Sequence, residues 1–465
     1  MPESKYVYYD FTLSLCSTCL KRVEAKIVFE DDKVYMLKRC PEHGREKVLI
    51  ATDVEYYKNI RNYNKTSEYP LRFNTKTHHG CPYDCGLCTD HEQHSCLTLI
   101  EVTDRCNLSC PTCYASSSPT HGRHRTLAEI EEMLDIIVRN EGEPDVVQIS
   151  GGEPTVHPQF FEILDLAKAR PIRHLMVNTN GIRIAKDIRF VERLANYMPD
   201  FEIYLQFDSF KPEALESLRG ENLLETRLKA LEHLNKYNLS TTLVVTLQKG
   251  LNDDEIGKII DFALQQPCVR GVTFQPTQIA GRVDNFDPRT DRLTPTEVRT
   301  AILEQTGLFS SNDLLPVPCN PDALTMAYAL KIDGQVHPLT RYLDPDQLLN
   351  NSRNTIVYEQ DQGLHEQVLK VFSTAHSVDA IEGDLYELMC CLPHVKAPGL
   401  AYNNLFRIII MNFMDAYNFD VRAIKKSCVH IVHKDGRIIP FETMNLFYRE
   451  AEQEAYMQTL VGHPL

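Results

Sequence analysis

The chain has 465 residues, of which 43% are hydrophobic and 24% charged, a composition typical of a globular protein with two or three domains. Its formal net charge is −15 without a basic stripe, which argues against nucleic acid as a partner because phosphates require clustered positive charge. The longest apolar run, residues 405–414, contains Arg407 and Asn412 and is too short to cross a bilayer. The first residues lack the apolar stretch of a signal peptide, so we expect a cytoplasmic location.

Fifteen cysteines are many for a chain expected in a reducing compartment, where disulfides are rare. Ten of them lie in the first 113 residues and form tight groups. Scattered cysteines usually behave as small buried hydrophobic residues, whereas groups with regular spacing favour metal binding.

Residues 1–60 predict a small metal-binding module. Its β-like segments surround four candidate ligands with C-x2-C…C-x2-H spacing: Cys16, Cys19, Cys40 and His43. This set suits one tetrahedral ion, either zinc or a mononuclear rubredoxin-like iron. Because all four positions are filled by the protein, we expect a structural role.

Residues 61–97 carry a second group of cysteines, which lie within sixteen residues: Cys81, Cys85, Cys88 and Cys96. Four thiolates saturate a [4Fe–4S] cube, so this segment predicts an auxiliary cluster, with a zinc knuckle as the alternative. Three nearby histidines are expected to donate hydrogen bonds to sulfur or to lie at the surface: His79, His91 and His94.

From residue 98 to 290 the pattern alternates between strand-like and helix-like segments, which predicts an α/β fold with a parallel sheet. The predicted strands are residues 97–103, 146–150, 174–180, 202–208, 241–247 and 271–277. Six such units can form an open or partial barrel, with the active site at the carboxyl ends of the strands.

Three cysteines follow the first strand with C-x3-C-x2-C spacing: Cys106, Cys110 and Cys113. Three thiolates can hold a [4Fe–4S] cube and leave one iron without a protein ligand. The amino and carboxylate groups of S-adenosylmethionine (SAM) can chelate such an iron, and electron transfer then yields a 5′-deoxyadenosyl radical. Zinc is the alternative, although it most often uses paired C-x2-C knuckles.

The second strand ends in Gly151-Gly152-Glu153-Pro154. Glycines at a strand end let a ligand approach the backbone, and the carboxylate can accept hydrogen bonds from an ammonium group. This motif, one βα unit after C-x3-C-x2-C, is the signature of the radical SAM superfamily, which residues 97–278 closely resemble. The resemblance implies a partial (β/α)6 barrel in which the three cysteines hold the radical cluster. It also implies that Gly151, Gly152 and Glu153 hold the methionine part of SAM.

Polar residues at later strand ends are candidates for the remaining SAM contacts. We favour Asn178 and Asp208, with turn formation as the alternative interpretation for the neighbouring Asn180-Gly181 pair. Many members of the superfamily have an aromatic residue before the third cysteine. Here that position is Thr112, and Tyr114 follows the cysteine, so we expect a different contact to adenine.

Residues 291–465 predict an α+β region that serves the substrate or an auxiliary cluster, with hairpins at residues 333–334 and 435–436. Its four cysteines form either a further cluster or buried thiols: Cys319, Cys390, Cys391 and Cys428. We favour buried thiols, because two adjacent cysteines cannot easily both reach one cube.

Three segments resemble one group, the tetraether (membrane-spanning) lipid synthase-like radical SAM proteins. They are residues 16–44, the CPYDCGLCTDHEQHSC block, and SCVHIVHKDGRIIPFETMNLFYRE near the end of the chain. The resemblance implies removal of hydrogen from an unactivated carbon and C–C coupling of lipid chains. Relatives are also described as pterin-directed methyltransferases, which is the alternative. The pattern departs at Ser427 and Glu442, where that group has cysteines.

This interpretation implies a set of partners. They are SAM, a low-potential electron donor of the ferredoxin or flavodoxin type, and a lipid or other hydrophobic substrate, with peripheral membrane contact if the substrate is a lipid. Residues 405–414 would line an apolar tunnel or fill the core. Oxygen-sensitive clusters imply an anaerobic setting. A non-enzymatic protein with several zinc knuckles is the remaining hypothesis, and it leaves the Gly-Gly-Glu-Pro motif unexplained.

Overall fold

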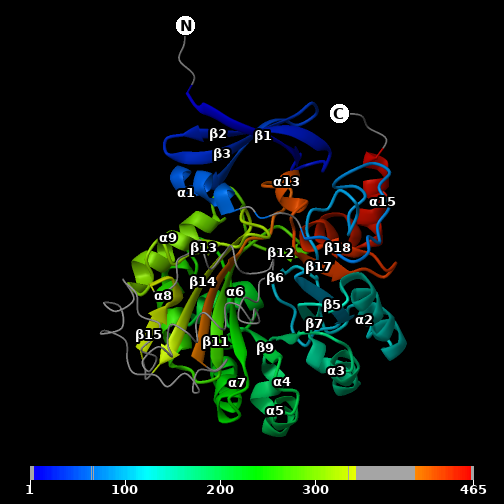
Figure 1. Ribbon diagram of the computed structural model, residues 1–465, viewed down its shortest axis with the longest axis vertical. Helices are drawn as coiled ribbons and strands as arrows, with labels where there is room; N and C mark the ends of the chain where they lie inside the picture. The colour runs from blue at the N-terminus through cyan, green and yellow to red at the C-terminus, as the bar shows by residue number, and fades with distance from the viewer. Residues whose placement is uncertain (1–4, 64, 66–67, 333–334, 342–403, 462–465) are drawn as a thin grey trace, which may run out of the picture.

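The computed structural model describes residues 5–63, 65, 68–332, 335–341 and 404–461. The N-terminal module is a four-stranded antiparallel sheet, which lies at one end of the long axis of the molecule (Figure 1). Its strands are β1 (Val7–Leu15), β2 (Arg22–Glu30), β3 (Lys33–Cys40) and β4 (Gly44–Ala51). Asp31 and Asp32 form the tight turn between β2 and β3 with positive φ angles, as short polar residues tolerate. The short α1 (Val54–Asn59) and η1 (Ile60–Tyr63) follow.

The six predicted strands are present and run parallel, with neighbours in chain order. They are β5 (Leu97–Thr103), β7 (Val146–Gly151), β8 (His174–Thr179), β9 (Phe201–Gln206), β10 (Thr241–Leu247) and β11 (Val269–Pro276). The helices that connect them are α2 (Leu127–Glu141), α3 (Phe160–Lys168), α4 (Ile182–Lys186), α5 (Ile188–Ala195), α6 (Pro212–Arg219), α7 (Leu224–Lys236) and α8 (Ile256–Gln265). The predicted partial (β/α)6 barrel is therefore confirmed.

The described strands of the C-terminal region extend the sheet of the barrel at both edges. After α9 (Pro295–Thr306), β16 (Leu405–Met411) adds to β11 and β17 (Val429–Val432) adds to β5, and both run parallel to their neighbours. The antiparallel strands β13 (Leu315–Pro316), β14 (Leu324–Ile332), β15 (Gln335–Pro338) and β18 (Ile438–Pro440) complete the two edges. The region joins the barrel because its apolar strands bury edges that would otherwise present unpaired backbone groups.

The strands β17 and β18 pair around the hairpin predicted at residues 435–436. The turn predicted at residues 333–334 lies outside the described residues, although the flanking β14 and β15 pair with each other. The remaining elements are short: β6 (Thr112–Cys113), β12 (Arg282–Val283), η2 (Pro154–Val156), η3 (Asp253–Glu255), η4 (Leu339–Arg341), α13 (Val421–Ile424), α14 (Phe441–Thr443) and the π-helical η10 (Met444–Tyr448). The helix α15 (Ala451–Leu460) ends the described chain.

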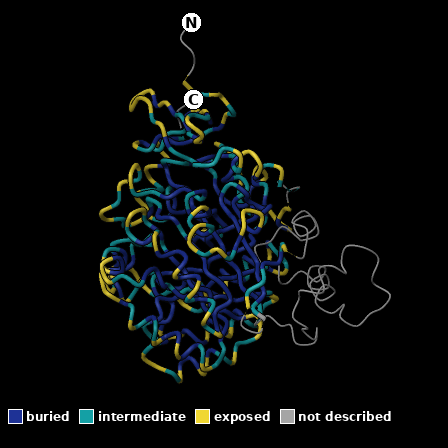
Figure 2. Tube along the Cα trace, turned by 90° about the vertical axis from the view of Figure 1, so that its left-hand side faces the viewer, coloured by how far each residue is buried: buried dark blue, intermediate teal, exposed yellow. Residues whose placement is uncertain are grey.

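Buried residues fill the body of the molecule between the sheet and its helices (Figure 2). One ion cluster lies inside this core: Arg407 on β16 donates two hydrogen bonds to Glu202 on β9, which also lies 3.2 Å from His174 on β8. Burial opposes ionisation of Glu202, but the Arg407 guanidinium and the hydrogen bonds outweigh it and hold the pKa of this carboxyl well below its usual range. The cluster ties the added strand β16 to the barrel.

The N-terminal module docks on the barrel through a buried lysine. Lys38 on β3 donates hydrogen bonds to the carbonyl oxygens of Leu15, Ala416 and Tyr417. Arg422 on α13 also pairs with Asp10 on β1. None of the described helices is long and apolar enough to cross a membrane.

Candidate active site

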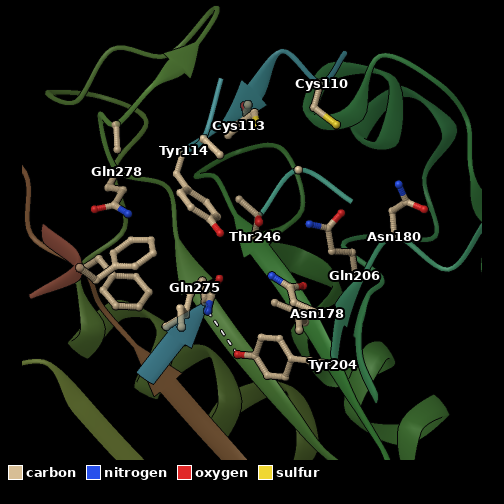
Figure 3. A pocket seen from close by; sticks show the side chains of 18 of the residues that line it. Cys110, Cys113, Tyr114, Asn178, Asn180, Tyr204, Gln206, Thr246, Gln275 and Gln278 are labelled. Carbon is tan, nitrogen blue, oxygen red and sulfur yellow. Dashed lines mark hydrogen bonds between the residues drawn. The ribbon is translucent and has the colours of Figure 1, made fainter. Parts of the chain in front are cut away.

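A cavity opens at the carboxyl ends of the parallel strands, as the barrel predicts. Cys110 and Cys113 lie at one end of it, and Tyr204 and Gln275 at the other, with the Tyr114 ring between them (Figure 3). The thiols of the motif and these polar side chains therefore face the same space.

The three cysteines of the C-x3-C-x2-C motif lie on the loop after β5 and line this cavity. Cys110 is buried, while Cys106 and Cys113 are half-buried. Burial and the nearby Glu153 carboxylate raise the pKa of the Cys106 thiol to about 12, so a bound cation must supply the charge that ionises it. This half-open set of thiols fits a cluster that keeps one iron available to a ligand.

The cluster loop is held by residues far away in the sequence. Arg282 on β12 donates to the carbonyl oxygens of Cys110 and Ser117, and β12 pairs with β6, which contains Cys113. Asn180 donates to the side chain of Asn107, between the first two cysteines. Sequence reasoning did not identify these supports, because nothing in the local pattern links them to the loop.

Gly151 is the last residue of β7 and Gly152 follows it. Both lie against Thr103 and Arg105, where the cluster loop begins. A Cβ atom on either glycine would collide with backbone oxygen, that of Thr103 or that of Arg105. The Gly152 amide donates to Thr103 and the Glu153 amide to Arg105, at 2.8 and 2.9 Å. The glycines are therefore required for this backbone contact, and all three motif residues also line the cavity.

The Glu153 carboxylate is almost completely buried and already accepts several hydrogen bonds. They come from the amides of Asn180 and Thr155 and from the hydroxyls of Thr155 and Thr179. Burial raises the pKa of Glu153 in spite of these bonds. A carboxylate positioned in this way beside the thiols could accept hydrogen bonds from an ammonium group.

The two other predicted SAM contacts differ in position. Asn178 lines the cavity, with its amide 3.4 Å from the Ser150 hydroxyl. Asp208 is fully buried and is not among the lining residues. It binds the Arg219 guanidinium with both oxygens, and Arg219 is the side chain that reaches the cavity. Asp208 is therefore a support for Arg219 rather than a direct contact, which the strand-end position alone did not distinguish.

The aromatic residue after the third cysteine points into the cavity. The Tyr114 hydroxyl lies 3.1 Å from that of Ser150, and its ring packs 5.0 Å from the Phe441 ring. Arg449, which pairs with the buried Glu101, lies over the same ring. Tyr114 thus occupies an aromatic position beside the cluster loop, as expected from its place next to the cysteine.

The predicted four-cysteine auxiliary group is divided between two places. Cys81, Cys85 and Cys88 remain neighbours, and the Thr443 hydroxyl donates to the sulfur of Cys85. Cys96, by contrast, lies in a buried group whose sulfur atoms are all within 4.8 Å of one another: Cys96, Cys319 and Cys428. Cys96 is separated from the first three because it directly precedes β5 and is carried into the sheet beside β17.

Cys319 and Cys428 are buried, as expected, but they lie together with Cys96 and so could also bind a metal. Their sulfur atoms are 3.4 Å apart. The Nε2 atom of His94 lies 3.5 Å from the Cys96 sulfur, and its Nδ1 atom lies 3.1 Å from Glu141. Cys390 and Cys391 are outside the described residues.

The ligands of the N-terminal module come together as predicted. Cys16, Cys19, Cys40 and His43 lie within 4.8 Å of one another. The His43 Nδ1 atom is 3.5 Å from the Cys40 sulfur and 3.7 Å from that of Cys16. Cys106, Cys110 and Cys113 form no comparably tight group. The four ligands of the N-terminal module therefore suit a single ion. The three cysteines of the C-x3-C-x2-C motif suit a larger inorganic group.

Comparison with known proteins agrees with this division. Residues 100–263 match the model of the radical SAM superfamily, and residues 8–52 match that of the HMPTM N-terminal zinc ribbon domain. The 7,8-dihydro-6-hydroxymethylpterin dimethyltransferase of Methanocaldococcus jannaschii is 33% identical over 96% of this chain and 95% of its own length. The chain belongs to this radical SAM family. It is accordingly a radical SAM iron–sulfur enzyme that uses a [4Fe–4S] cluster and SAM.

Other relatives match a smaller part of this chain. A probable GTP 3′,8-cyclase of Thermococcus kodakarensis is 32% identical over 35% of this chain and 52% of its own. The crystal structure of Streptococcus suis SuiB bound to S-adenosylmethionine covers 45% of this chain and 46% of its own, with 17% identity and a TM-score of 0.38. The predicted tetraether lipid synthase subgroup is not supported by the full-length relative, whose name describes a pterin methyltransferase.

Proposed function

We propose that this enzyme transfers methyl groups to carbon atoms of a pterin-like small molecule. The observation that carries the proposal is the relationship, over almost the full length of both chains, to a 7,8-dihydro-6-hydroxymethylpterin dimethyltransferase. The match includes the N-terminal ribbon as well as the barrel. The alternative drawn from the sequence therefore replaces lipid coupling as the leading hypothesis.

When bound, a reduced [4Fe–4S] cluster with SAM supplies a 5′-deoxyadenosyl radical, which can remove hydrogen from an unactivated C–H bond. In our proposal Cys106, Cys110 and Cys113 bind that cluster, and Gly151, Gly152 and Glu153 hold the methionine part of SAM. Asn178 and Arg219 face the same space from β8 and α6. The cavity walls limit the access of water to the reacting atoms.

One wall of the cavity is rich in side-chain amides. They lie on β7, β8, β9 and β11: Gln148, Asn178, Gln206 and Gln275. A carboxamide offers both donors and an acceptor, which suits the edge of a pterin ring with its mixed amino, amide and ring nitrogen groups. The Gln275 amide already donates to the Tyr204 hydroxyl at 3.2 Å, which fixes its orientation (Figure 3).

Another part of the cavity wall is apolar and aromatic. The ring centroids of Phe413 and Phe441 lie 4.1 Å apart, and Leu99 and Met411 also line the cavity, with the Met411 sulfur 3.7 Å from the Gln275 amide. A flat heteroaromatic ring can pack on such a wall while its edge faces the amides. This wall is also the specific observation that favours the second candidate, coupling of lipid hydrocarbon chains, because Met411 and Phe413 belong to the segment 405–414 expected to line an apolar tunnel.

The other cysteine groups complete the proposal. We assign an auxiliary iron–sulfur cluster to Cys81, Cys85 and Cys88, and a further metal site to the buried group around Cys96. The ribbon would hold one zinc or mononuclear iron. A low-potential ferredoxin or flavodoxin is the proposed electron donor.

In our proposal one SAM yields the radical that removes hydrogen, and a second SAM donates the methyl group and, with one electron from the reductant, leaves as S-adenosylhomocysteine. The test is an anaerobic reaction of the reconstituted enzyme with SAM, a reductant and 7,8-dihydro-6-hydroxymethylpterin. We expect a pterin product heavier by one or two methyl groups and 5′-deoxyadenosine, with neither product from the Cys110→Ala variant. Archaeal-type diether lipid in place of the pterin should give no coupled product. Coupled lipid with no methylated pterin would overturn the proposal in favour of the second candidate.

A further inference from the structure

Among the described residues, a buried cation near the radical site, Arg227, has no hydrogen-bond partner. The Arg227 side chain on α7 is fully buried, and its Nε, Nη1 and Nη2 atoms have no hydrogen-bond partner within the described part of the chain. A guanidinium carries five N–H donors, and a buried charge without a partner is strongly unfavourable. The Arg227 guanidinium is therefore expected to lie near an anion that balances its charge when the site is occupied.

The position of Arg227 is fixed by the helix it belongs to. Its backbone amide donates to the carbonyl of Leu223 at 2.9 Å, so the two residues lie one turn apart on the same face of the chain. Leu223 packs against Leu108 and Cys110 of the cluster loop. Arg227 therefore lies behind the loop that carries the three cysteines. It does not line the cavity, unlike Arg219.

The charged groups near this guanidinium include Asp208, Arg219, Cys110 and Glu153. Burial lowers the pKa of Arg227 to about 10. Asp208 is already bound by Arg219 through both oxygens. Glu153 is bound by its own hydroxyl and amide donors. Among these groups Cys110 is the one that gains negative charge when a cluster binds.

We propose that Arg227 is the buried counter-charge of the radical cluster and raises its reduction potential. A [4Fe–4S]²⁺ cube with three cysteine thiolates has a net charge of about −1, and one-electron reduction makes it more negative. A fixed positive charge behind the loop stabilises the reduced form more than the oxidised form. Arg227 is thus a positioning residue for electron transfer, independent of which substrate the enzyme methylates.

The inference is tested by redox titration of the anaerobically reconstituted full-length enzyme, following the SAM-sensitive EPR signal. Arg227→Met, which removes the charge at similar volume, should shift the midpoint to a more negative potential, while Arg227→Lys should retain most of the wild-type value. Arg270→Met is the matched control. Arg270 is also fully buried, but it donates to Asn238 and to the Pro267 carbonyl, and its midpoint should equal that of the wild type.

Three outcomes would overturn the inference. An Arg227→Met midpoint equal to that of the wild type would remove the electrostatic role. An equal shift in Arg270→Met would indicate a general structural effect. An unchanged midpoint with weaker SAM binding would assign the guanidinium to the SAM carboxylate instead.

Stability gives a second, independent measurement if Arg227→Met loads the cluster poorly. Replacing an unpaired buried cation with an apolar side chain should not lower the melting temperature of cluster-free protein, and should raise it. A lower melting temperature of cluster-free Arg227→Met would show that the guanidinium has an internal partner, which contradicts the inference.

Discussion

The ribbon and the cluster loop both use cysteines to bind metal, yet they are constructed differently. The ribbon ligands lie within 28 residues, two on each side of β2 and β3, and its hairpins bring all four together. The cluster loop supplies three thiols and depends on remote residues such as Arg282 and Asn180 for its shape. A complete local set forms a structural site, whereas an incomplete set facing a cavity leaves a position for chemistry.

The largest effect should follow from removing one of the three cysteines of the cluster loop. Cys110→Ala should abolish 5′-deoxyadenosine formation, because two thiolates cannot retain the cube, while the metal content of the ribbon stays constant. Iron, sulfide and zinc analysis together with chromatographic detection of 5′-deoxyadenosine measures this. Cys268→Ala is the control, since Cys268 is equally buried but lies between α8 and β11. Full activity in Cys110→Ala would contradict the assignment.

A second large effect concerns what holds the extended barrel together. Arg407→Met should lower the free energy of unfolding by about 3–5 kcal/mol, because it leaves the buried Glu202 carboxylate without its main partner. The double variant Arg407→Met/Glu202→Met should recover much of this loss. Chemical denaturation of the three proteins measures both values. Equal stability of the wild type and Arg407→Met would show that β16 is held by packing alone.

Removing a ligand of the N-terminal ribbon should affect the stability of that module and leave SAM cleavage intact. Cys40→Ser should lose one ion per chain and increase hydrogen exchange in residues 7–51, because the small sheet depends on its metal. Formation of 5′-deoxyadenosine should continue. If Cys40→Ser abolished SAM cleavage while the iron content of the radical cluster stayed constant, the ribbon would have a catalytic rather than structural role.

The smallest effect is the pH dependence of folding stability that Glu202 contributes in the barrel. The pKa of Glu202 is depressed in the folded protein by Arg407 and its hydrogen bonds, which outweigh burial. Its stabilising contribution is therefore complete above its unfolded pKa of about 4.3 and is lost as the pH falls through the lower folded value. Denaturation between neutral and acidic pH should show a shallower loss of stability in Glu202→Gln than in the wild type. Parallel curves would contradict this.

Much of the architecture was predictable because it depends on local sequence patterns. The six parallel strands follow from apolar runs of five to seven residues that alternate with helical segments. The ribbon ligands and the cysteines of the cluster loop follow from spacing alone. These features depend on residues close together in the sequence, so no tertiary information was needed.

The features that were missed depend on contacts between distant segments. Cys96 joins Cys319 and Cys428 because β17 adds to β5, which the spacing of Cys96 from Cys88 does not reveal. Asp208 turns to Arg219, eleven residues later, and not to the cavity. The partnerless state of Arg227 is visible only when its surroundings are known.

The most direct test of the central assignment is EPR spectroscopy of the reduced protein with and without SAM. It should be carried out on the wild type and on a variant with Cys106, Cys110 and Cys113 all changed to alanine. We predict a [4Fe–4S]¹⁺ signal that changes on addition of SAM in the wild type, and loss of that signal alone in the variant. A SAM-sensitive signal that survives in the variant would place the radical chemistry elsewhere in the molecule.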